Sequence, residues 1–360
     1  MYILAIESSC DETSAAVIEK GENGFTVKSN IVASQIETHR LYGGVVPEIA
    51  SRAHIEAISR ITYEALEVAG VKLSDLSLVA VTSNPGLIGA LLVGVNFAKA
   101  LAAANSIPLV AVDHIKGHIA AAYLTDTDVP KPPFVALAAS GGHTSIYKVH
   151  DYVTLEVIGE TRDDAIGESF DKIGRMIGIP YPAGAGFDKL STEGFLLATG
   201  EEDIGVAYKK YKKSAAYKNP DMALPSPALS GETLDFSFSG LKTAAINLLH
   251  KYEQKGVEID RALFAARYTY EAIEAVAKKM SMAIENNPGC DVVVSGGVAA
   301  NSHLRRRLSE VAEAHGVKIF IPKLSLCGDN GAMIGAAGYY EYESGRRADS
   351  SLNASALDSI

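Results

Sequence analysis

Two stretches of this chain repeat one design, and this repetition constrains the fold more than any other feature. Near the N-terminus the apolar strand YILAIESSC runs into a hydroxyl-rich turn and returns as a second strand, TSAAVIE. Near the middle, FVALAAS, GGHT and SIYKVHD repeat strand, turn and strand. At 360 residues the chain exceeds the roughly 250–300 residues that one hydrophobic core usually supports. We therefore expect two lobes of related architecture.

Strand and helix patterns alternate around these two units. Residues 47–70 have helical apolar spacing and end at Gly70, while residues 76–94 and 290–316 each predict a buried strand, a glycine-containing loop and a helix. Residues 329–345 predict a closing helix. This alternation is typical of an α/β fold with buried central strands. The sequence PPF at residues 132–134 is our predicted hinge between the lobes.

Composition and charge narrow the function. The net charge of −10 argues against a protein that binds nucleic acid over its whole surface. Two basic clusters, YKKYKKSAAYK at 208–218 and RRR at 305–307, are either solvated faces or local nucleic-acid contacts. The longest apolar run, residues 86–104, is interrupted by Asn96 and Lys99, which predicts a buried helix and not a membrane span.

The cysteines and the first residues predict a cytoplasmic protein. Cys10, Cys290 and Cys327 form no CxxC pair, which disfavours a disulfide framework and a zinc ribbon and fits a reducing compartment. The opening MYILAIESSCDE has no basic region before its apolar run, so we expect no signal peptide.

Glycine-rich turns follow several predicted strands. SGGHTS at 140–145, SGGVAANS at 295–302 and NPGLIG at 84–89 would let backbone N–H groups approach phosphate oxygens, although they could also be ordinary turns. None matches a P-loop or a Rossmann fingerprint. Asp171 and Asp188 could accept hydrogen bonds from sugar hydroxyls, or they could be surface acids.

His114 and His118, in DHIKGH, lie four residues apart, which places them on one helix face. That spacing suits one shared metal ion, and it equally suits two half-buried histidines at a helix end. No glutamate lies between them, so the pair lacks the general base of an HExxH metalloprotease. Asp329, in CGDNGAMIG, is a candidate third ligand, with the role of helix N-cap as the alternative.

Nine motifs in order resemble one family over nearly the whole chain. They are IESSCDETSAAV, GGVVPEIASRAH, PGLIGALLVG, DHIKGHIAAAY, SGGHTSIY, GESFDKIGRMIG, LDFSFSGLKTA, GGVAANSHLR and DNGAMIG. The chain resembles the bacterial tRNA N6-adenosine threonylcarbamoyltransferases, once named O-sialoglycoprotein endopeptidases. One departure from the family pattern is YPAGAG at 181–186, which has Ala183 and Ala185 where relatives carry glycine and proline.

The resemblance implies an actin-like/hexokinase-like ATPase fold with duplicated βββαβα cores. Its lobes would be residues 1–131 plus 325–360, closed by the C-terminal helix, and residues 132–324. It implies transfer of the threonylcarbamoyl group from threonylcarbamoyl-adenylate to N6 of the adenosine 3′ of the anticodon, in tRNAs that read ANN codons, with release of AMP. It also implies one divalent metal ion, iron or else zinc, on His114, His118 and Asp329.

The same resemblance assigns the other site residues and the partners. Nucleotide contacts fall on Ala139, Ser140, Gly141, Gly142, His143, Asp171, Gly184, Asp188 and Asn301. We hypothesise that Asp11 or Glu12 in the first turn acts as the base or orients the tRNA. The implied partners are a paralogous actin-like subunit, which would contact the helix at 47–66, and a small P-loop ATPase.

Two other functions compete with this interpretation. An ATP-dependent small-molecule kinase of the same fold would use a catalytic aspartate and magnesium, without a paired-histidine site. A non-catalytic nucleotide-binding scaffold would keep the glycine-rich turns but transfer nothing. Under the transferase interpretation the basic clusters at 208–218 and 305–307 become candidate tRNA contacts, because the target base lies in a single-stranded loop.

Overall fold

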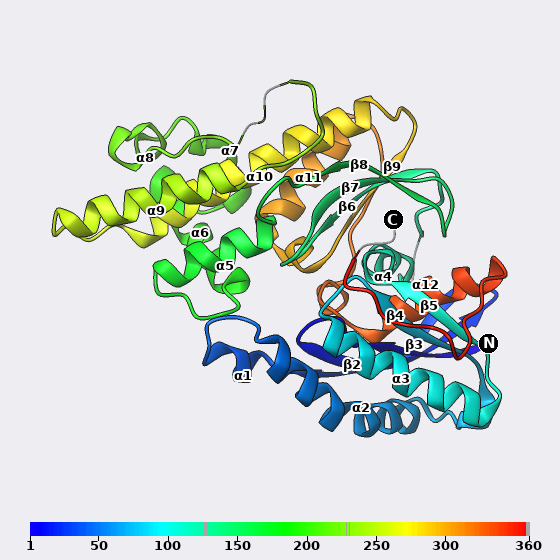
Figure 1. The fold of residues 1–360 in the computed structure, drawn as a ribbon. Helices are drawn as coiled ribbons and strands as arrows, with labels where there is room; N and C mark the ends of the chain where they lie inside the picture. The colour runs from blue at the N-terminus through cyan, green and yellow to red at the C-terminus, as the bar shows by residue number, and fades with distance from the viewer. Residues whose placement is uncertain (126–127, 228, 230, 358–360) are drawn as a thin grey trace.

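A computed structural model describes residues 1–125, 128–227, 229 and 231–357. Its strands form two five-stranded sheets (Figure 1). The first sheet holds β1 (Tyr2–Glu7), β2 (Glu12–Gly21), β3 (Gly24–Ser34), β4 (Leu76–Asn84) and β5 (Leu109–Asp113). The second holds β6 (Phe134–Ala139), β7 (Thr144–Val149), β8 (Leu155–Glu160), β9 (Asp291–Ser295) and β10 (Ile319–Phe320).

The two sheets have the same topology. The first runs β3-β2-β1-β4-β5 and the second β8-β7-β6-β9-β10. In each sheet the first three strands pair antiparallel and the other two join in parallel. The central strands β1 and β6 are buried almost throughout, as strands covered on both faces must be. The duplication predicted from the two strand–turn–strand units is therefore confirmed.

Helices cover both sheets. The first half contains α1 (Ile36–Arg40), α2 (Pro47–Ala69), α3 (Ile88–Asn105) and α4 (His114–Ala120), and the second contains α5 (Ile166–Met176), α6 (Gly184–Thr199), α7 (Ile204–Tyr211), α8 (Ala215–Lys218), α9 (Ser239–Gln254), α10 (Arg261–Glu285) and α11 (Ser302–Ala314). The last helix, α12 (Gly331–Glu343), returns to the first sheet. As predicted, α2 ends at Gly70, whose φ of 66° is the left-handed C-terminal cap.

Helices α4 and α12 lie between the two sheets (Figure 1). One buried cluster joins Val110 and Val112 of the first sheet, Ala136 and Ala138 of the second, and Ile119 of α4. This shared core carries the metal-site candidates. We keep the predicted lobe boundaries at 131/132 and 324/325 as a proposal.

A row of glycines lets α12 lie directly on the first sheet. A Cβ at Gly331 would lie 2.7 Å from the backbone nitrogen of Ala16, and one at Gly338 would lie 2.5 Å from Cβ of Ala80. Ser14 strengthens this contact, because its Oγ accepts a hydrogen bond from the Gly331 N–H at 2.8 Å. The close approach fixes the start of α12, and with it the preceding loop that carries Asp329.

Helix α3 is long and apolar enough, by length and composition, to cross a membrane. In the structure its inner face, including Leu91, Val95 and Ala98, is buried against β4 and α2. A core helix of a globular protein has the same composition, so this single helix is weak evidence for a membrane segment.

Candidate metal centre and nucleotide site

The two predicted histidine ligands are presented by the first turns of α4. Asp113 caps this helix, because its Oδ1 accepts hydrogen bonds from the N–H groups of Ile115 and Lys116 at 2.9 and 3.3 Å. The cap is held in turn by Asn84, whose Nδ2 donates to Asp113 Oδ2 at 2.6 Å. The sequence therefore starts a helix at the end of β5, and both imidazoles project from one face of it.

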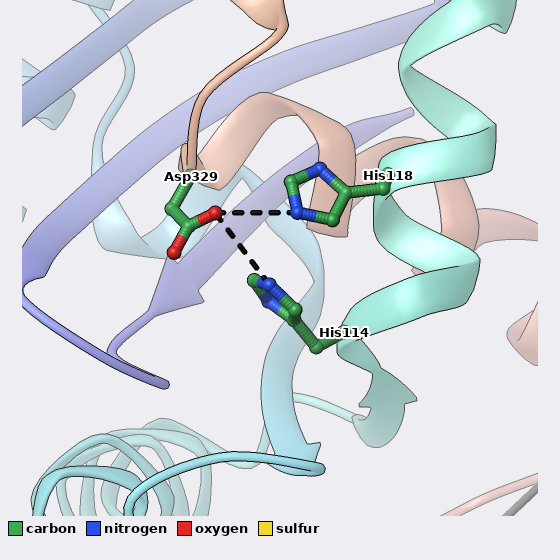
Figure 2. A group of neighbouring side chains, drawn as sticks. All are labelled: His114, His118 and Asp329. Carbon is green, nitrogen blue, oxygen red and sulfur yellow. Dashed lines mark ion pairs between the residues drawn. The ribbon is translucent and has the colours of Figure 1, made fainter. Parts of the chain in front are cut away.

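Asp329 reaches the same point from the loop before α12 (Figure 2). Its Oδ1 lies 3.5 Å from Nε2 of His114 and 3.3 Å from Nε2 of His118. The alternative role of Asp329 as helix cap is not the one observed, because Asn330 caps α12 by accepting from the Met333 N–H. Asp329 is thus left to face the histidines.

Gly117, between the two histidines, allows α4 to approach α12 closely. A Cβ at this position would lie 2.5 Å from Cδ1 of Ile334 and 3.4 Å from Cγ of Met333. Gly117 lowers the helix propensity of α4, and the close packing against α12 explains why glycine is present there. The close approach brings the helix that carries His118 to the helix that follows Asp329.

Glu7, at the end of β1, supports His114 from behind. Its Oε2 lies 3.0 Å from Nδ1 of His114, and the carboxylate also accepts hydrogen bonds from the Thr82 hydroxyl and the Ser9 N–H. Glu7 is fully buried. A carboxylate on the second ring nitrogen of a metal-binding histidine fixes its tautomer and orientation. The sequence alone gives no sign of this role for Glu7, since only the fold brings β1 to α4.

The charges at this site favour a cation. Burial lowers the pKa of His114, but the carboxylates of Glu7 and Asp329 outweigh burial and raise it to about 9. Burial raises the pKa of Asp329, but the two imidazoles outweigh it and hold that pKa well below its usual range. The site therefore stabilises positive charge between two carboxylates.

The residues at this site fit a divalent metal. The possible ligand atoms of His114, His118 and Asp329 all lie within 4.8 Å of one another. His118 is 1% exposed, and within the described residues neither of its ring nitrogens makes a hydrogen bond. Its Nε2 faces only the Asp329 carboxylate, at 3.3 Å, and a buried nitrogen with so little polar contact is suited to bind a metal. Two imidazoles and one carboxylate form a donor set suited to iron(II) or zinc.

Asp11 ends the turn between β1 and β2, and Glu12 is the first residue of β2. Three carbonyls of this turn accept hydrogen bonds from other elements. The Ser9 carbonyl accepts from Leu87 N, the Cys10 carbonyl from His54 Nε2, and the Asp11 carbonyl from Gln35 N. Burial, Asp329 and Asp11 raise the pKa of Glu12 to about 9. The Glu12 carboxyl therefore interacts strongly with Asp11 and Asp329, and both Asp11 and Glu12 remain candidates for the base or for orienting the tRNA.

Ala139 ends β6, and residues 140–143 form the tight turn from β6 to β7. The Ser140 N–H donates to the His143 carbonyl at 2.8 Å, and the Ser140 Oγ accepts from the His143 N–H at 3.1 Å. Gly141 and Gly142 are exposed, with open space where a Cβ would lie. The His143 ring also lowers the pKa of Asp329, so this turn lies near the metal-site candidates.

The remaining predicted nucleotide residues gather at the starts of α6 and α11. Asp171 Oδ1 accepts from the Ala183 N–H at 2.7 Å, and Asp188 Oδ1 accepts from the N–H and hydroxyl of Ser302. Asn301 caps α11 by accepting from the Leu304 N–H. Gly184 begins α6 with open space at its Cβ position. No hydrogen bond or ion pair given for the described residues joins this group to the three metal-ligand candidates.

The two basic clusters are largely engaged within the chain. Tyr208 and Tyr211 are buried, so they are core residues and cannot stack on RNA bases. Lys209 and Lys210 pair with Glu310 and Glu201. In the other cluster, Arg305 donates to the carbonyls of Ala299 and Pro322, and Arg307 pairs with Glu274. The alternation of lysine and tyrosine is therefore explained by α7, a helix that buries its tyrosines and exposes its lysines.

The repeated sheet topology defines a class of protein, the actin-like ATPase fold. Two solved structures agree with this class. Component A of (R)-2-hydroxyglutaryl-CoA dehydratase from Acidaminococcus fermentans has a TM-score of 0.51 at 14% identity, covering 96% of this chain and 100% of that one. Full-length HypF, in its phosphate- and nucleotide-bound form, has a TM-score of 0.50 at 16% identity, covering 95% of this chain and 46% of that one.

Sequence relatives identify the family within this class. The family model of the tRNA N6-adenosine threonylcarbamoyltransferases matches residues 26–336. Relatives of that name from Clostridium botulinum (strain 657 / Type Ba4) and Clostridium perfringens (strain 13 / Type A) are 48% and 46% identical, each over 98% of this chain and 96% of the relative. The chain belongs to the tRNA N6-adenosine threonylcarbamoyltransferase family, and it is a transferase that modifies tRNA.

Proposed function

We propose that this chain transfers the threonylcarbamoyl group of threonylcarbamoyl-adenylate to N6 of the adenosine 3′ of the anticodon, in tRNAs that read ANN codons. The observation that carries the proposal is the convergence of His114, His118 and Asp329 beside the glycine-rich turn at 139–143. A small-molecule kinase of the same fold has no use for such a cluster. The reaction is placed in the cytoplasm, in keeping with its tRNA substrate and with three free cysteines.

His114, His118 and Asp329 would hold one iron(II) or zinc ion, which would act as a Lewis acid on the donor phosphate. The open backbone of Gly141 and Gly142 allows close approach of the donor phosphate or carbamoyl oxygen. Asp171, Asp188 and Asn301 lie where they would hold the nucleoside of the donor, since each retains polar atoms beyond the Oδ1 used inside the chain.

The proposed transfer reaction requires one proton acceptor. N6 of adenosine attacks the carbamoyl carbon, the bond from that carbon to the phosphate oxygen breaks, and AMP leaves with the bonding electrons. The attacking amine must lose a proton, and we propose that the Asp11 carboxylate accepts it. The Asp11 Oδ2 is 3.4 Å from the Tyr181 hydroxyl, which can hold the carboxylate in place.

The direct test supplies the purified chain and its partner subunits with threonylcarbamoyl-adenylate and unmodified tRNA. Mass spectrometry of the digested tRNA should show threonylcarbamoyladenosine, with AMP released in equal amount. The kinase alternative predicts ATP-dependent phosphorylation of a sugar or another small molecule instead. The scaffold alternative predicts nucleotide binding without either product.

Helix α2 is our proposed contact for the paralogous actin-like subunit, which would work together with a small P-loop ATPase. Its outer face exposes Ile55 and Tyr63, at 64% and 54%. Arg52 and Arg60 on this helix pair only with Glu48 and Glu64 of the same helix, among the described residues. An exposed apolar surface with charged residues around it is typical of a protein interface.

Charge reversal should disrupt this interface. The double variant Arg52→Glu/Arg60→Glu is expected to lower the affinity for the paralogous subunit by about tenfold or more, because a charge reversal opposes a contact that the arginines favour. In gel filtration the two subunits should then elute separately. The variant Lys251→Glu/Lys255→Glu, on the exposed end of α9, makes the same charge change elsewhere and should leave the complex intact. An unchanged complex in the first variant removes α2 from the interface.

A further inference from the structure

Exposed apolar side chains follow α1 at the junction of the two halves of the molecule. Leu41 is 83% exposed and Tyr42 is 60% exposed. They belong to the loop between α1 and α2, which Figure 1 shows facing α5 of the second half. Two adjacent exposed apolar side chains form a small continuous surface, and the charged residues around it indicate what it could bind.

Arginines from both halves surround this loop. Arg40 Nε donates to the carbonyl of Tyr181 at 3.0 Å, and Arg175 donates to the carbonyl of Gly43. Gly43 has a φ of 72°, and a Cβ there would lie 3.0 Å from Nη1 of Arg175, so the arginine lies against the glycine next to Tyr42. We call Arg40, Leu41, Tyr42, Arg175 and Arg261 the bridging patch.

Arg261 extends the patch on the second half. It is exposed at the start of α10, and its Nη2 would be 3.5 Å from a Cβ at Gly178. The N–H of Gly178 donates to the Arg175 carbonyl, so the two arginines flank one turn. Across the described parts of the chain, neither Arg175 nor Arg261 lies within ion-pair distance of a carboxylate, although Arg175 is near enough to Asp171 to oppose the rise in its pKa. Arg40 pairs with Glu37 on its own helix.

The patch is connected to the proposed reaction site. The Tyr181 carbonyl accepts from Arg40, while the hydroxyl of the same tyrosine lies 3.4 Å from Asp11 Oδ2. On the other side, the Asp11 carbonyl accepts from the N–H of Gln35, directly before α1. Two short paths therefore join the bridging patch to the turn that holds the candidate base.

We propose that the bridging patch binds single-stranded RNA, namely the anticodon-loop nucleotides next to the target adenosine. Unstacked bases of RNA loops stack on aromatic rings and on guanidinium planes, and phosphates pair with arginine. Tyr42 supplies the ring, and Arg175 and Arg261 supply the charge. This inference rests on the proposed function, since it names the part of the chain that would position its tRNA substrate.

A binding measurement tests the patch separately from transfer. Fluorescence anisotropy would follow a labelled, unmodified anticodon stem–loop RNA added to the full chain. Tyr42→Ala should weaken the affinity roughly tenfold, the effect of losing one base stack, whereas Tyr42→Phe should stay within about twofold because it keeps the ring. Leu197→Ala removes a similarly exposed apolar side chain at the C-terminal end of α6 and should change nothing.

Arg261 tests the phosphate contact, because Arg175 also joins the two halves. Arg261→Ala should reduce the slope of log affinity against log salt by about 0.7, the value for one phosphate on a single strand. Wild-type RNA affinity in both Tyr42→Ala and Arg261→Ala overturns the proposal. So does loss of a partner subunit from Tyr42→Ala with RNA affinity unchanged, which would make the patch a protein interface.

Failure of the proposed function would look different. A wild-type chain that binds no stem–loop RNA, alone or with its partner subunits, and makes no threonylcarbamoyladenosine contradicts the function itself. Normal transfer by the wild type, together with full RNA affinity in the patch variants, contradicts only the patch.

Discussion

Replacing His118 with alanine is expected to remove the bound metal and to slow threonylcarbamoyl transfer by roughly 100-fold or more, since a Lewis acid supplies several kcal/mol of stabilisation. His118 is the better choice of the two histidines because, within the described chain, the only polar contact of its ring is with the proposed co-ligand Asp329. Metal content by plasma mass spectrometry and single-turnover transfer rates would measure the two effects.

His114→Ala should also lose metal, but with a cost to folding. Its removal leaves the buried Glu7 carboxylate without its imidazole partner, a change that costs about 3–5 kcal/mol for buried pairs. The thermal midpoint of metal-free His114→Ala should therefore fall well below that of metal-free His118→Ala. His150→Ala is the matched control, because that exposed histidine pairs only with Glu156 among the residues described. Full metal content in His118→Ala would contradict the assigned ligand set.

Local patterns predicted much of the fold. The two strand–turn–strand units predicted two related sheets, and the end of α2 at Gly70 could be placed because a C-terminal glycine acts through its own backbone. The convergence of His114 and His118 also follows from helix geometry alone. Each of these features depends on residues close together in the sequence.

The rest depends on contacts between distant segments. Glu7 lies 107 residues from His114, and no spacing rule connects a strand end to a helix start at that separation. The buried face of α7 is another case, since alternating lysine and tyrosine looks the same in a core helix and in an RNA-binding segment. Arg175 and Gly43 meet only when the two halves pack together. These contacts could not be predicted from the sequence, because they form only when distant segments pack together in the folded chain.

Glu7→Gln is expected to weaken metal binding 10–100-fold, the usual effect of losing a partner behind a metal-binding histidine. Glutamine keeps the shape of the side chain, but it removes the negative charge that holds the proton on His114 Nδ1. It also turns an NH₂ group toward donors, because the Thr82 hydroxyl and the Ser9 N–H both donate to this carboxylate. The ring of His114 would then lose its fixed orientation, and Nε2 would no longer face Asp329 reliably.

Titration of the metal-free protein with Co²⁺ would test this effect without relying on transfer activity, since visible absorption reports both the affinity and the geometry of the site. Glu341→Gln is the matched control. Glu341 is also a buried carboxylate, and it joins α12 to α4 through Lys116 at 3.1 Å, but it touches neither histidine. We expect Glu341→Gln to bind Co²⁺ within about threefold of wild type, with the same spectrum. Equal Co²⁺ affinity in wild type and Glu7→Gln would mean that Glu7 serves only the packing of β1. His114 would then be oriented by α4 and by the Ser9 hydroxyl, which lies 3.1 Å from its Nδ1.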